Sequence, residues 1–158
     1  MKGHDIDSTN GSASYNSTVR SLASVGSMQQ LLEQTVSKVD HFRDACLLGA
    51  AWLKQRGFSS ACADGGFGLD EWAAVCALLL QSGGNQGRPL FSPRYSAIQL
   101  FKAMLQVFSG RDMFDPLVLR GTIKLSSSKQ PAVYDAETGV NLLYKMTPWS
   151  YRDRKSVV

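Results

Sequence analysis

The stretch that decides the fold runs from Cys46 to Phe108, reading CLLGAAWLKQRGFSSACADGGFGLDEWAAVCALLLQSGG over residues 46–84 and GRPLFSPRYSAIQLFKAMLQVF over residues 87–108. Within it, the run from Leu69 to Gln81 is apolar on almost every side of a helix. A helix without a polar face has to be surrounded by other elements. This run is therefore predicted to be the central helix of the core.

Two further helices are expected next to this one in the sequence. The first begins at Asp40, which is placed to cap it, and ends at Gly57. Gly49 in its middle weakens a helix, so its expected use is to let a neighbouring helix approach closely. The second begins at Ser92 and Pro93, a cap followed by a first-turn proline. Its predicted apolar face consists of Ile98, Phe101, Met104, Leu105 and Phe108.

The N-terminal region divides into two parts. Residues 1–24 are rich in Ser, Asn, Gly and Thr and contain few large apolar side chains, so burial cannot offset the entropy of ordering them. We expect residues 1–24 to be a flexible extension and residues 25–158 to form one helical domain. Residues 28–39 have helical spacing, with Ser27 placed to cap them.

After Gly110 the pattern changes from helical spacing to short β-like segments. A turn at residues 137–139 indicates a small hairpin, and Pro148 with Trp149 begins a last helix. The expected fold class is therefore mainly α, a helical bundle with a small β-hairpin near the C-terminus. The predicted β segments are 117–125, 132–134 and 142–146.

Composition narrows the classes of protein to which the chain can belong. Its 158 residues are 44% hydrophobic and 19% charged, as expected for one domain with a substantial core. No apolar run reaches the roughly 18 residues of a membrane helix, so no membrane partner is expected. Its three cysteines form no CxxC pair and indicate core or turn positions rather than a disulfide or zinc framework.

The net charge of +4 is unevenly distributed along the chain. Residues 1–93 contain seven Lys and Arg against eight Asp and Glu, whereas residues 94–158 contain ten against five. A basic half suits phosphate contacts or an acidic partner, although an ordinary solvated surface is the simpler explanation. The candidate RNA or partner contacts are Arg94, Lys145, Arg152, Arg154 and Lys155.

Catalytic and metal-binding patterns are missing from the sequence. The glycine clusters at 65–68 and 83–87 lack the Lys-Ser/Thr pair of a phosphate loop and are predicted to be turns between helices. The adjacent Asp70 and Glu71 diverge by about 100° on a helix and suit its positive N-terminal end. The chain's two histidines are too few and too far apart for a metal site, and no cysteine has an evident histidine partner for nucleophilic catalysis. We therefore expect no metal site, no catalytic residue and no cofactor.

Five motifs occur in order along the chain. They are WLKQRGF at 52–58, GGFG at 65–68, EWAAVCALLLQSGG at 71–84, GRPLFSPRYSAIQLFKAMLQ at 87–106 and KMTPWSY at 145–151. With these motifs the chain resembles the Nrap family, the nucleolar RNA-associated proteins of the small-subunit processome, over residues 15–151. Members combine nucleotidyltransferase-like domains with helical domains similar to the substrate-binding domain of poly(A) polymerases, CCA-adding enzymes and oligoadenylate synthetases.

This resemblance, to the first of those helical domains, implies a function. It implies a non-catalytic scaffold domain of a nucleolar factor in 40S ribosome assembly and pre-rRNA processing. The implied partners are other small-subunit processome proteins, including an RNA-binding assembly factor and casein kinase 2, with pre-rRNA as a further candidate. A working transferase needs a Gly-Ser turn and then a strand with paired carboxylates for divalent metal. Here Gly26-Ser27 is followed by a helical pattern instead of a strand, and the Asp40 that comes next is followed by His41 and Phe42 and has no paired carboxylate. No catalytic residue of the family's relatives is therefore assigned to this chain.

Two alternatives to the scaffold stay open at this point. The domain could be the nucleotide-binding accessory domain of an active nucleotidyltransferase, or an interaction domain without a role in RNA binding. A thermal shift caused by a nucleotide would identify the first. Salt-dependent RNA binding that needs Arg152, Arg154 and Lys155 would argue against the second.

Overall fold

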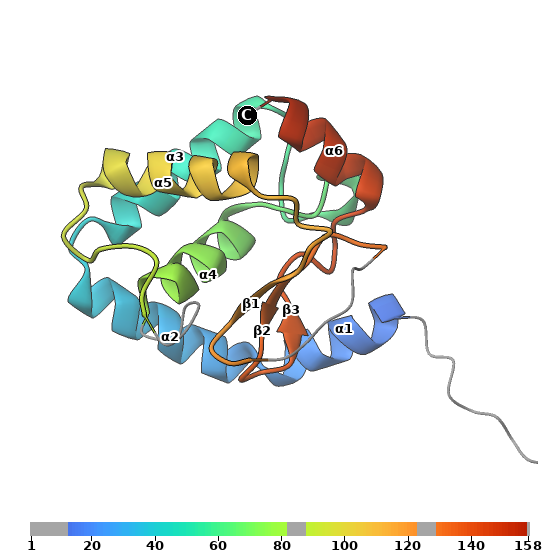
Figure 1. Cartoon of the computed structure of the whole chain (residues 1–158), viewed down its shortest axis with the longest axis horizontal. Coiled ribbons are helices and arrows are strands. Elements are labelled where there is room, and N and C mark those ends of the chain that lie inside the picture. Colours follow the sequence, from blue (N-terminus) through green and yellow to red (C-terminus); the bar gives the residue numbers. More distant parts are fainter. Residues whose placement is uncertain (1–12, 82–87, 123–128, 158) are drawn as a thin grey trace, which may run out of the picture.

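Six α-helices and a three-stranded sheet make up the computed structural model, which describes residues 13–81, 88–122 and 129–157 (Figure 1). Residues 62–64 form a short 3-10 helix between α3 and α4. The elements are α1 (Ala13–Ala23), α2 (Val25–Lys38), α3 (Phe42–Gln55), α4 (Leu69–Leu80), α5 (Ala97–Gly110), β1 (Leu117–Leu119), β2 (Val133–Asp135), β3 (Val140–Asn141) and α6 (Pro148–Val157).

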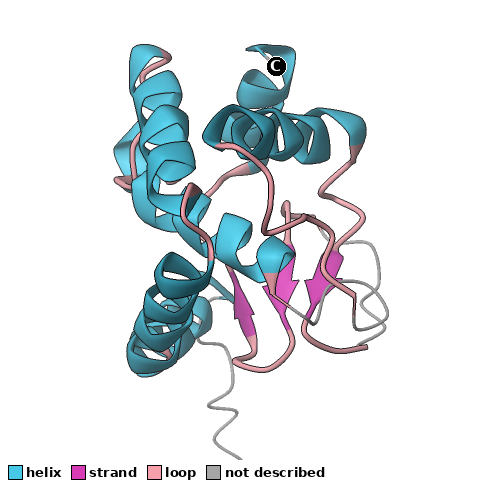
Figure 2. Cartoon of the chain, turned by 90° about the vertical axis from the view of Figure 1, so that its left-hand side faces the viewer, coloured by secondary structure: helices cyan, strands magenta, loops and turns pink. Residues whose placement is uncertain are grey.

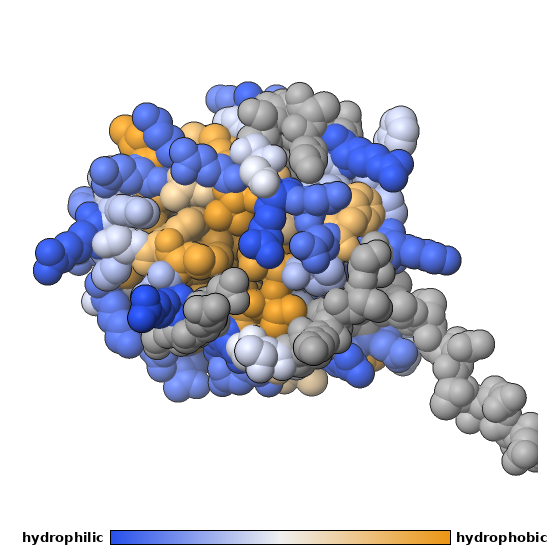
Figure 3. Space-filling view, viewed as in Figure 1, coloured by the Kyte–Doolittle hydropathy of each residue, from blue (hydrophilic) through white to orange (hydrophobic). Residues whose placement is uncertain are grey.

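Helix α4 occupies the centre of the molecule, with α2, α3 and α5 around it (Figure 1). Every residue from Glu71 to Leu80 is buried. Helices α2 and α3 both pack against α4, and α3 also packs along α5. The predicted central core helix is therefore confirmed. In the view of Figure 3, apolar residues gather in the middle of the face and hydrophilic residues surround them.

Gly49 lies where α3 passes closest to α4. A Cβ atom at this position would collide with the indole ring of Trp72, so only glycine leaves room for that ring. Trp72 is fully buried, and its ring centroid lies 6.5 Å from that of Trp52, 5.9 Å from Phe101 and 6.2 Å from Phe108. The close approach predicted for Gly49 is confirmed, and its neighbour is an aromatic cluster.

The sheet lies on one side of the helices (Figure 2). Strand β1 pairs with β2 in parallel, and β2 pairs with β3 in antiparallel. The β2–β3 pair is the predicted hairpin, with Gly139 at a φ of +70° in its turn. The expected strand at 142–146 is wrong. Asn141 ends β3, and its side-chain Oδ1 accepts the amides of Val133 (3.2 Å) and Leu143 (3.0 Å), which closes a turn instead.

The start of α5 differs from the prediction based on Ser92 and Pro93. The helix begins after Ser96, whose hydroxyl accepts the Gln99 amide at 3.2 Å while the Gln99 side chain accepts the Ser96 amide at 2.9 Å. This reciprocal capping box satisfies two amides at once, which the proline signal does not. The buried face is accordingly shifted to Leu100, Met104 and Phe108, and Ile98 is 58% exposed.

Helices α2 and α3 also begin at positions other than those predicted. The cap of α2 is Ser24 rather than Ser27, and the cap of α3 is His41 rather than Asp40, with no side-chain capping bond in either. The predicted end of α3 is confirmed, because Gly57 has a φ of +77° and its amide donates to the Lys54 carbonyl at 3.0 Å.

Helix α1 forms within the segment 1–24, where a flexible extension was expected. Its Tyr15, Val19 and Leu22 side chains are exposed, and the helix contacts β3 and α2. Residues 1–12 and the glycine cluster at 83–87 lie outside the described residues. The boundary between extension and domain stays a prediction. Among the helices that are described, none is long and apolar enough to cross a membrane.

Candidate functional site

The sequence Thr147-Pro148-Trp149-Ser150 sets the start of α6 and thereby the position of the candidate site. The Thr147 amide donates to the Ser150 hydroxyl at 3.0 Å, and the Ser150 amide donates to the Thr147 hydroxyl at 3.1 Å. Pro148 follows the cap as the first helical residue, where its missing N–H costs nothing. The predicted last helix is confirmed, and the cap-then-proline signature operates here rather than before α5.

Tyr151 attaches α6 to the segment before β1. Its side chain is buried, and its hydroxyl accepts the Met113 amide at 2.9 Å and donates to the Arg111 carbonyl at 3.2 Å. The Tyr151 ring also packs edge-on against Phe114, with a centroid distance of 5.3 Å. These contacts fix which side of α6 faces the protein, and they leave the side with Trp149 and Arg152 open to solvent.

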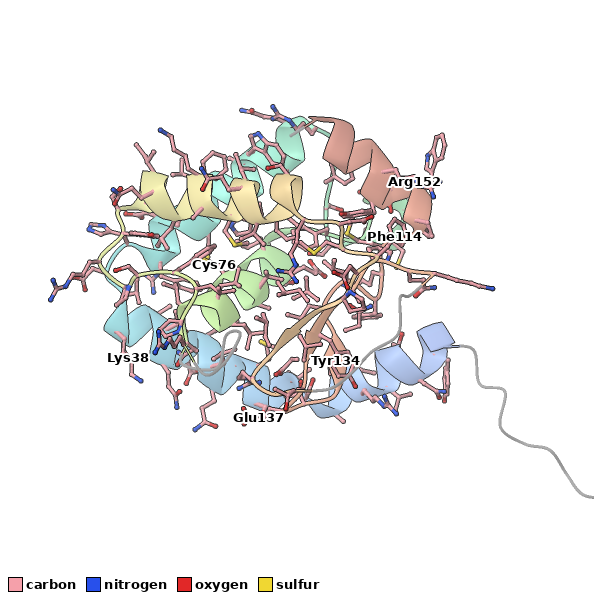
Figure 4. All side chains as sticks on the ribbon, in the orientation of Figure 1. Lys38, Cys76, Phe114, Tyr134, Glu137 and Arg152 are labelled. Atoms are coloured by element: carbon pink, nitrogen blue, oxygen red, sulfur yellow. The ribbon has the colours of Figure 1, made fainter. Side chains whose placement is uncertain are left out.

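Arg152 is an exposed cation that the protein holds in place. Its guanidinium carbon lies 5.7 Å from the centroid of Phe114, and the two residues lie next to each other at the edge of the molecule (Figure 4). Trp149 precedes Arg152 by three residues, which places both on one face of the helix. We call Trp149, Arg152 and Phe114 the α6 surface. It combines a flat exposed ring with an oriented positive charge.

The other predicted contact residues do not all join this surface. Arg94 is exposed in the loop before α5. This loop and α6 lie on opposite sides of the molecule (Figure 1). Arg154 and Lys155 belong to α6 by their backbone, and their side chains lie outside the described part of the structure. The structure therefore brings Arg152, Arg154 and Lys155 onto one helix, separate from Arg94.

Lys145 is engaged within the domain. Its ammonium donates to Glu71 Oε1 at 2.6 Å and to the Ser60 carbonyl at 3.1 Å. Glu71 Oε2 in turn accepts the Ser60 hydroxyl at 2.6 Å and the Gly68 amide at 2.9 Å. The turn packs closely against its neighbours, because a Cβ on Gly68 would collide with Ser60 and a Cβ on Gly66 would collide with Lys145. The glycine turn at 65–68 is thus a packed helix connection, as predicted.

The Glu71–Lys145 pair makes stability depend on pH. Burial alone would raise the pKa of Glu71, but the hydrogen bonds from Lys145, Ser60 and Gly68 outweigh it, so the pKa lies below its usual value. Burial would lower the pKa of Lys145, but its bond to Glu71 raises it. The contribution of Glu71 is present above the pKa of an unfolded Glu and is lost as pH falls through the lower folded value. That of Lys145 is lost only as strongly alkaline pH passes its raised value.

We therefore expect the stability difference between the wild type and Glu71→Gln to shrink as pH falls from about 6 to about 3. Urea denaturation at several pH values measures it. Asp70→Asn, which changes the exposed neighbouring carboxylate, is the matched control and should keep the acid dependence of the wild type. A difference that stays constant over this range would show that Glu71 is not stabilised as a carboxylate.

A second buried ion pair joins the end of β1 to the hairpin. Asp135 is fully buried, and its carboxylate accepts hydrogen bonds from two guanidinium nitrogens of Arg120. The distance from Arg120 Nε to Asp135 Oδ1 is 2.8 Å. Arg120 also contacts Glu137 at 2.9 Å and has a φ of +55°, which is uncommon for any residue except glycine. Neither ion pair was predicted from the sequence. The signal for the Arg120–Asp135 pair was an acidic residue, Asp135, at the end of the apolar run 132–134.

A hollow of about 370 Å³ lies between α2, the first turn of α4 and the segment after β3. Its lining includes the Glu71–Lys145 ion pair, in which the two charges neutralise each other. Within residues 13–81, 88–122 and 129–157, no three His, Cys, Asp or Glu side chains gather as metal ligands do. The apolar part of the lining of this hollow includes Met28, Leu32, Ala74, Val140 and Leu142.

Known proteins resemble this chain over most of its length. Residues 41–155 match the sequence model of the Nrap protein PAP/OAS-like domain. U3 small nucleolar RNA-associated protein 22 of Schizosaccharomyces pombe is 39% identical over 109 residues, covering 66% of this chain and 10% of that protein. Its namesake in Saccharomyces cerevisiae is 32% identical over 155 residues, covering 87% of this chain and 12% of that protein. The chain thus spans about a tenth of the length of these relatives.

Proposed function

Because the chain belongs to the Nrap family, we propose that it is a non-catalytic domain of a nucleolar ribosome-biogenesis factor. In this role it supports assembly of the 40S subunit and processing of pre-rRNA through contacts with protein and RNA. The observation that carries the proposal is the match of residues 41–155 to the PAP/OAS-like domain, together with two relatives named for their association with U3 small nucleolar RNA.

The use of the buried carboxylates supports a structural rather than a chemical role for this domain. Glu71 is paired with Lys145, and Asp135 is paired with Arg120. Each pair joins segments that are distant in sequence, so each carboxylate is needed for the fold and its charge is matched internally. Removing either partner would leave a buried charge without compensation.

The α6 surface supports the RNA contact. Its cation is exposed and lies over the Phe114 ring, and Arg154 and Lys155 follow on the same helix. The proposed protein partners are other small-subunit processome components, including an RNA-binding assembly factor and casein kinase 2. The proposed location is the nucleolus within the nucleus.

Association with U3 RNA tests this proposal. We expect an epitope-tagged form of the full-length protein, expressed in its own cells, to be located in nucleoli and to co-purify U3 RNA and pre-rRNA. Reverse transcription and quantitative PCR of the purified RNA measures the enrichment over an untagged strain. Recovery of both RNAs at the untagged level would contradict the proposal.

The hollow beside Glu71 and Lys145 keeps one alternative under consideration, a nucleotide-binding accessory domain. Because Glu71 neutralises Lys145 at 2.6 Å, we expect this hollow to attract phosphate weakly. ATP, CTP or UTP at about 1 mM with Mg²⁺ should leave the thermal midpoint unchanged. Inorganic tripolyphosphate is the matched control for charge. A shift with one nucleotide and none with tripolyphosphate would favour the alternative.

A further inference from the structure

We propose that Trp149 stacks on an unpaired base of single-stranded RNA while Arg152 contacts the adjacent phosphate. The inference rests on the proposed function, because it specifies the kind of RNA segment and the residues by which this domain would contact pre-rRNA. The contacts that hold α6 in place are made by Tyr151, Thr147 and Ser150 rather than by these two residues. Both are presented on the outer side of α6, which Tyr151 holds in one orientation.

Trp149 is the first observation that points to a ligand. Its side chain is 80% exposed, which is the largest exposed fraction among the large hydrophobic residues of the described part of the chain. Tryptophan gains more than other residues from being covered, because its ring has the largest apolar area. An exposed tryptophan on a rigid helix therefore keeps that free energy for a ligand. The cap made by Thr147 and Ser150 provides this rigidity.

The surroundings of Trp149 favour a nucleobase over an apolar protein surface. Protein docking sites present a contiguous apolar patch around their aromatic anchor. Here the neighbours along the helix are Ser150 and Arg152, and none of the other exposed large hydrophobic side chains that the structure describes lies on α6. An isolated ring beside a cation is the combination that binds single-stranded nucleic acid, with the ring on a base and the cation on the backbone.

Arg152 is prepared for a phosphate by its contact with Phe114. The ring below the guanidinium restricts the side chain, so binding a phosphate costs less side-chain entropy than at a free arginine. A guanidinium also offers two parallel N–H groups to one phosphate. Asp115 directly follows Phe114 in the sequence, and Asp112 precedes it by two residues. One carboxylate oxygen of Asp112 accepts a hydrogen bond from the Phe114 amide at 3.2 Å.

Single-stranded RNA fits this geometry better than a duplex does. The base faces of a duplex are covered by their neighbours, so a side chain such as Trp149 can stack only on a base that is unpaired. Stacking does not require a particular base, because every base has a π face. We therefore expect affinity for unpaired RNA with little preference for sequence.

Fluorescence anisotropy with the 158-residue chain tests the inference. The probes are a labelled oligouridine of about 12 nucleotides and a labelled RNA hairpin of the same length, each at several KCl concentrations. We expect Trp149→Leu to weaken oligouridine binding at least about fivefold and Trp149→Phe to change it less than about twofold, because phenylalanine keeps a π face. Arg152→Gln should reduce the slope of log affinity against log KCl concentration by about 1, as expected for the loss of one phosphate contact. Tyr15→Leu, at an aromatic residue 65% exposed on α1, is the matched control and should bind as the wild type.

The outcomes separate the inference from the proposed function. If the wild type and Trp149→Leu bind oligouridine equally, stacking is overturned while the RNA contact stands. Binding of the hairpin as tightly as oligouridine would overturn the preference for unpaired RNA. If the wild type shows no salt-dependent binding up to about 100 µM, both the inference and the RNA contact fail, and the co-purification with U3 RNA then tests the scaffold role separately. Circular dichroism melting of each variant verifies that it is folded.

Discussion

Trp72→Ala is expected to lower the free energy of unfolding by about 3–5 kcal/mol, the range for a fully buried large aromatic residue. The ring is inaccessible to solvent and contacts Trp52, Phe101 and Phe108. Gly49 has no side chain that could move into the space left behind. Because the surrounding helices cannot collapse onto the cavity without a shift of their backbones, the loss should lie in the upper part of the range for core substitutions.

Urea denaturation followed by circular dichroism measures this loss. Trp149→Ala is the matched control, because the same residue type is removed from an exposed site, and it should change stability by less than about 0.5 kcal/mol. Trp72→Phe should be intermediate. The buried Nε1 of Trp72 has no hydrogen-bond partner among the described residues, so neither substitution removes a hydrogen bond. The loss of stability should therefore follow the volume that the new side chain leaves empty. A loss below about 0.5 kcal/mol for Trp72→Ala would show that α4 is not the central helix.

Arg120→Ala is expected to lower the free energy of unfolding by about 3–5 kcal/mol, as removal of one partner from a buried ion pair does. The carboxylate of Asp135 is fully buried, and without Arg120 the hydrogen bonds that it keeps from described residues come from the Thr138 hydroxyl and the Glu137 amide. Arg120 joins β1 to the hairpin, so its loss also loosens the parallel strand pair.

The control and the pH dependence make this prediction specific. Glu137→Gln alters the exposed partner of Arg120 and should cost less than about 0.5 kcal/mol. Burial would raise the pKa of Asp135, but its hydrogen bonds with Arg120 and Thr138 lower it. Its contribution is therefore lost as pH falls through the lowered value, and the difference between wild type and Arg120→Ala should narrow in acid. An equal effect of Glu137→Gln and Arg120→Ala would contradict a buried pair.

The elements that could be predicted from sequence are those whose signal is local. The run from Leu69 to Gln81 has no polar face, and this is enough to place it at the centre. Gly49 within an apolar helical pattern indicates a close neighbour, and Gly139 in a short polar segment indicates a turn. Each of these signals depends on residues within a few positions, so no knowledge of the rest of the chain is needed.

The candidate site was predicted only in part. The charge of Arg152 and the position of Trp149 at a helix start can be seen in the sequence. Their arrangement next to Phe114 depends on the hydrogen bond between Met113 and Tyr151, which are 38 residues apart. The charge of Lys145 looks free in the sequence, whereas in the structure it is paired within the domain. Its partner Glu71 lies 74 residues away, and no local pattern relates the two.

By itself the sequence determined the class of the fold, the identity of its central helix, the position of the hairpin turn and the resemblance that the Nrap match later confirmed. Only the tertiary structure decided which charges are used inside and which remain for a partner. The physical reason is that periodicity and turn chemistry act between near neighbours, whereas the pairing of Glu71 with Lys145 and of Arg120 with Asp135 depends on which distant segments are brought together by burial of the core.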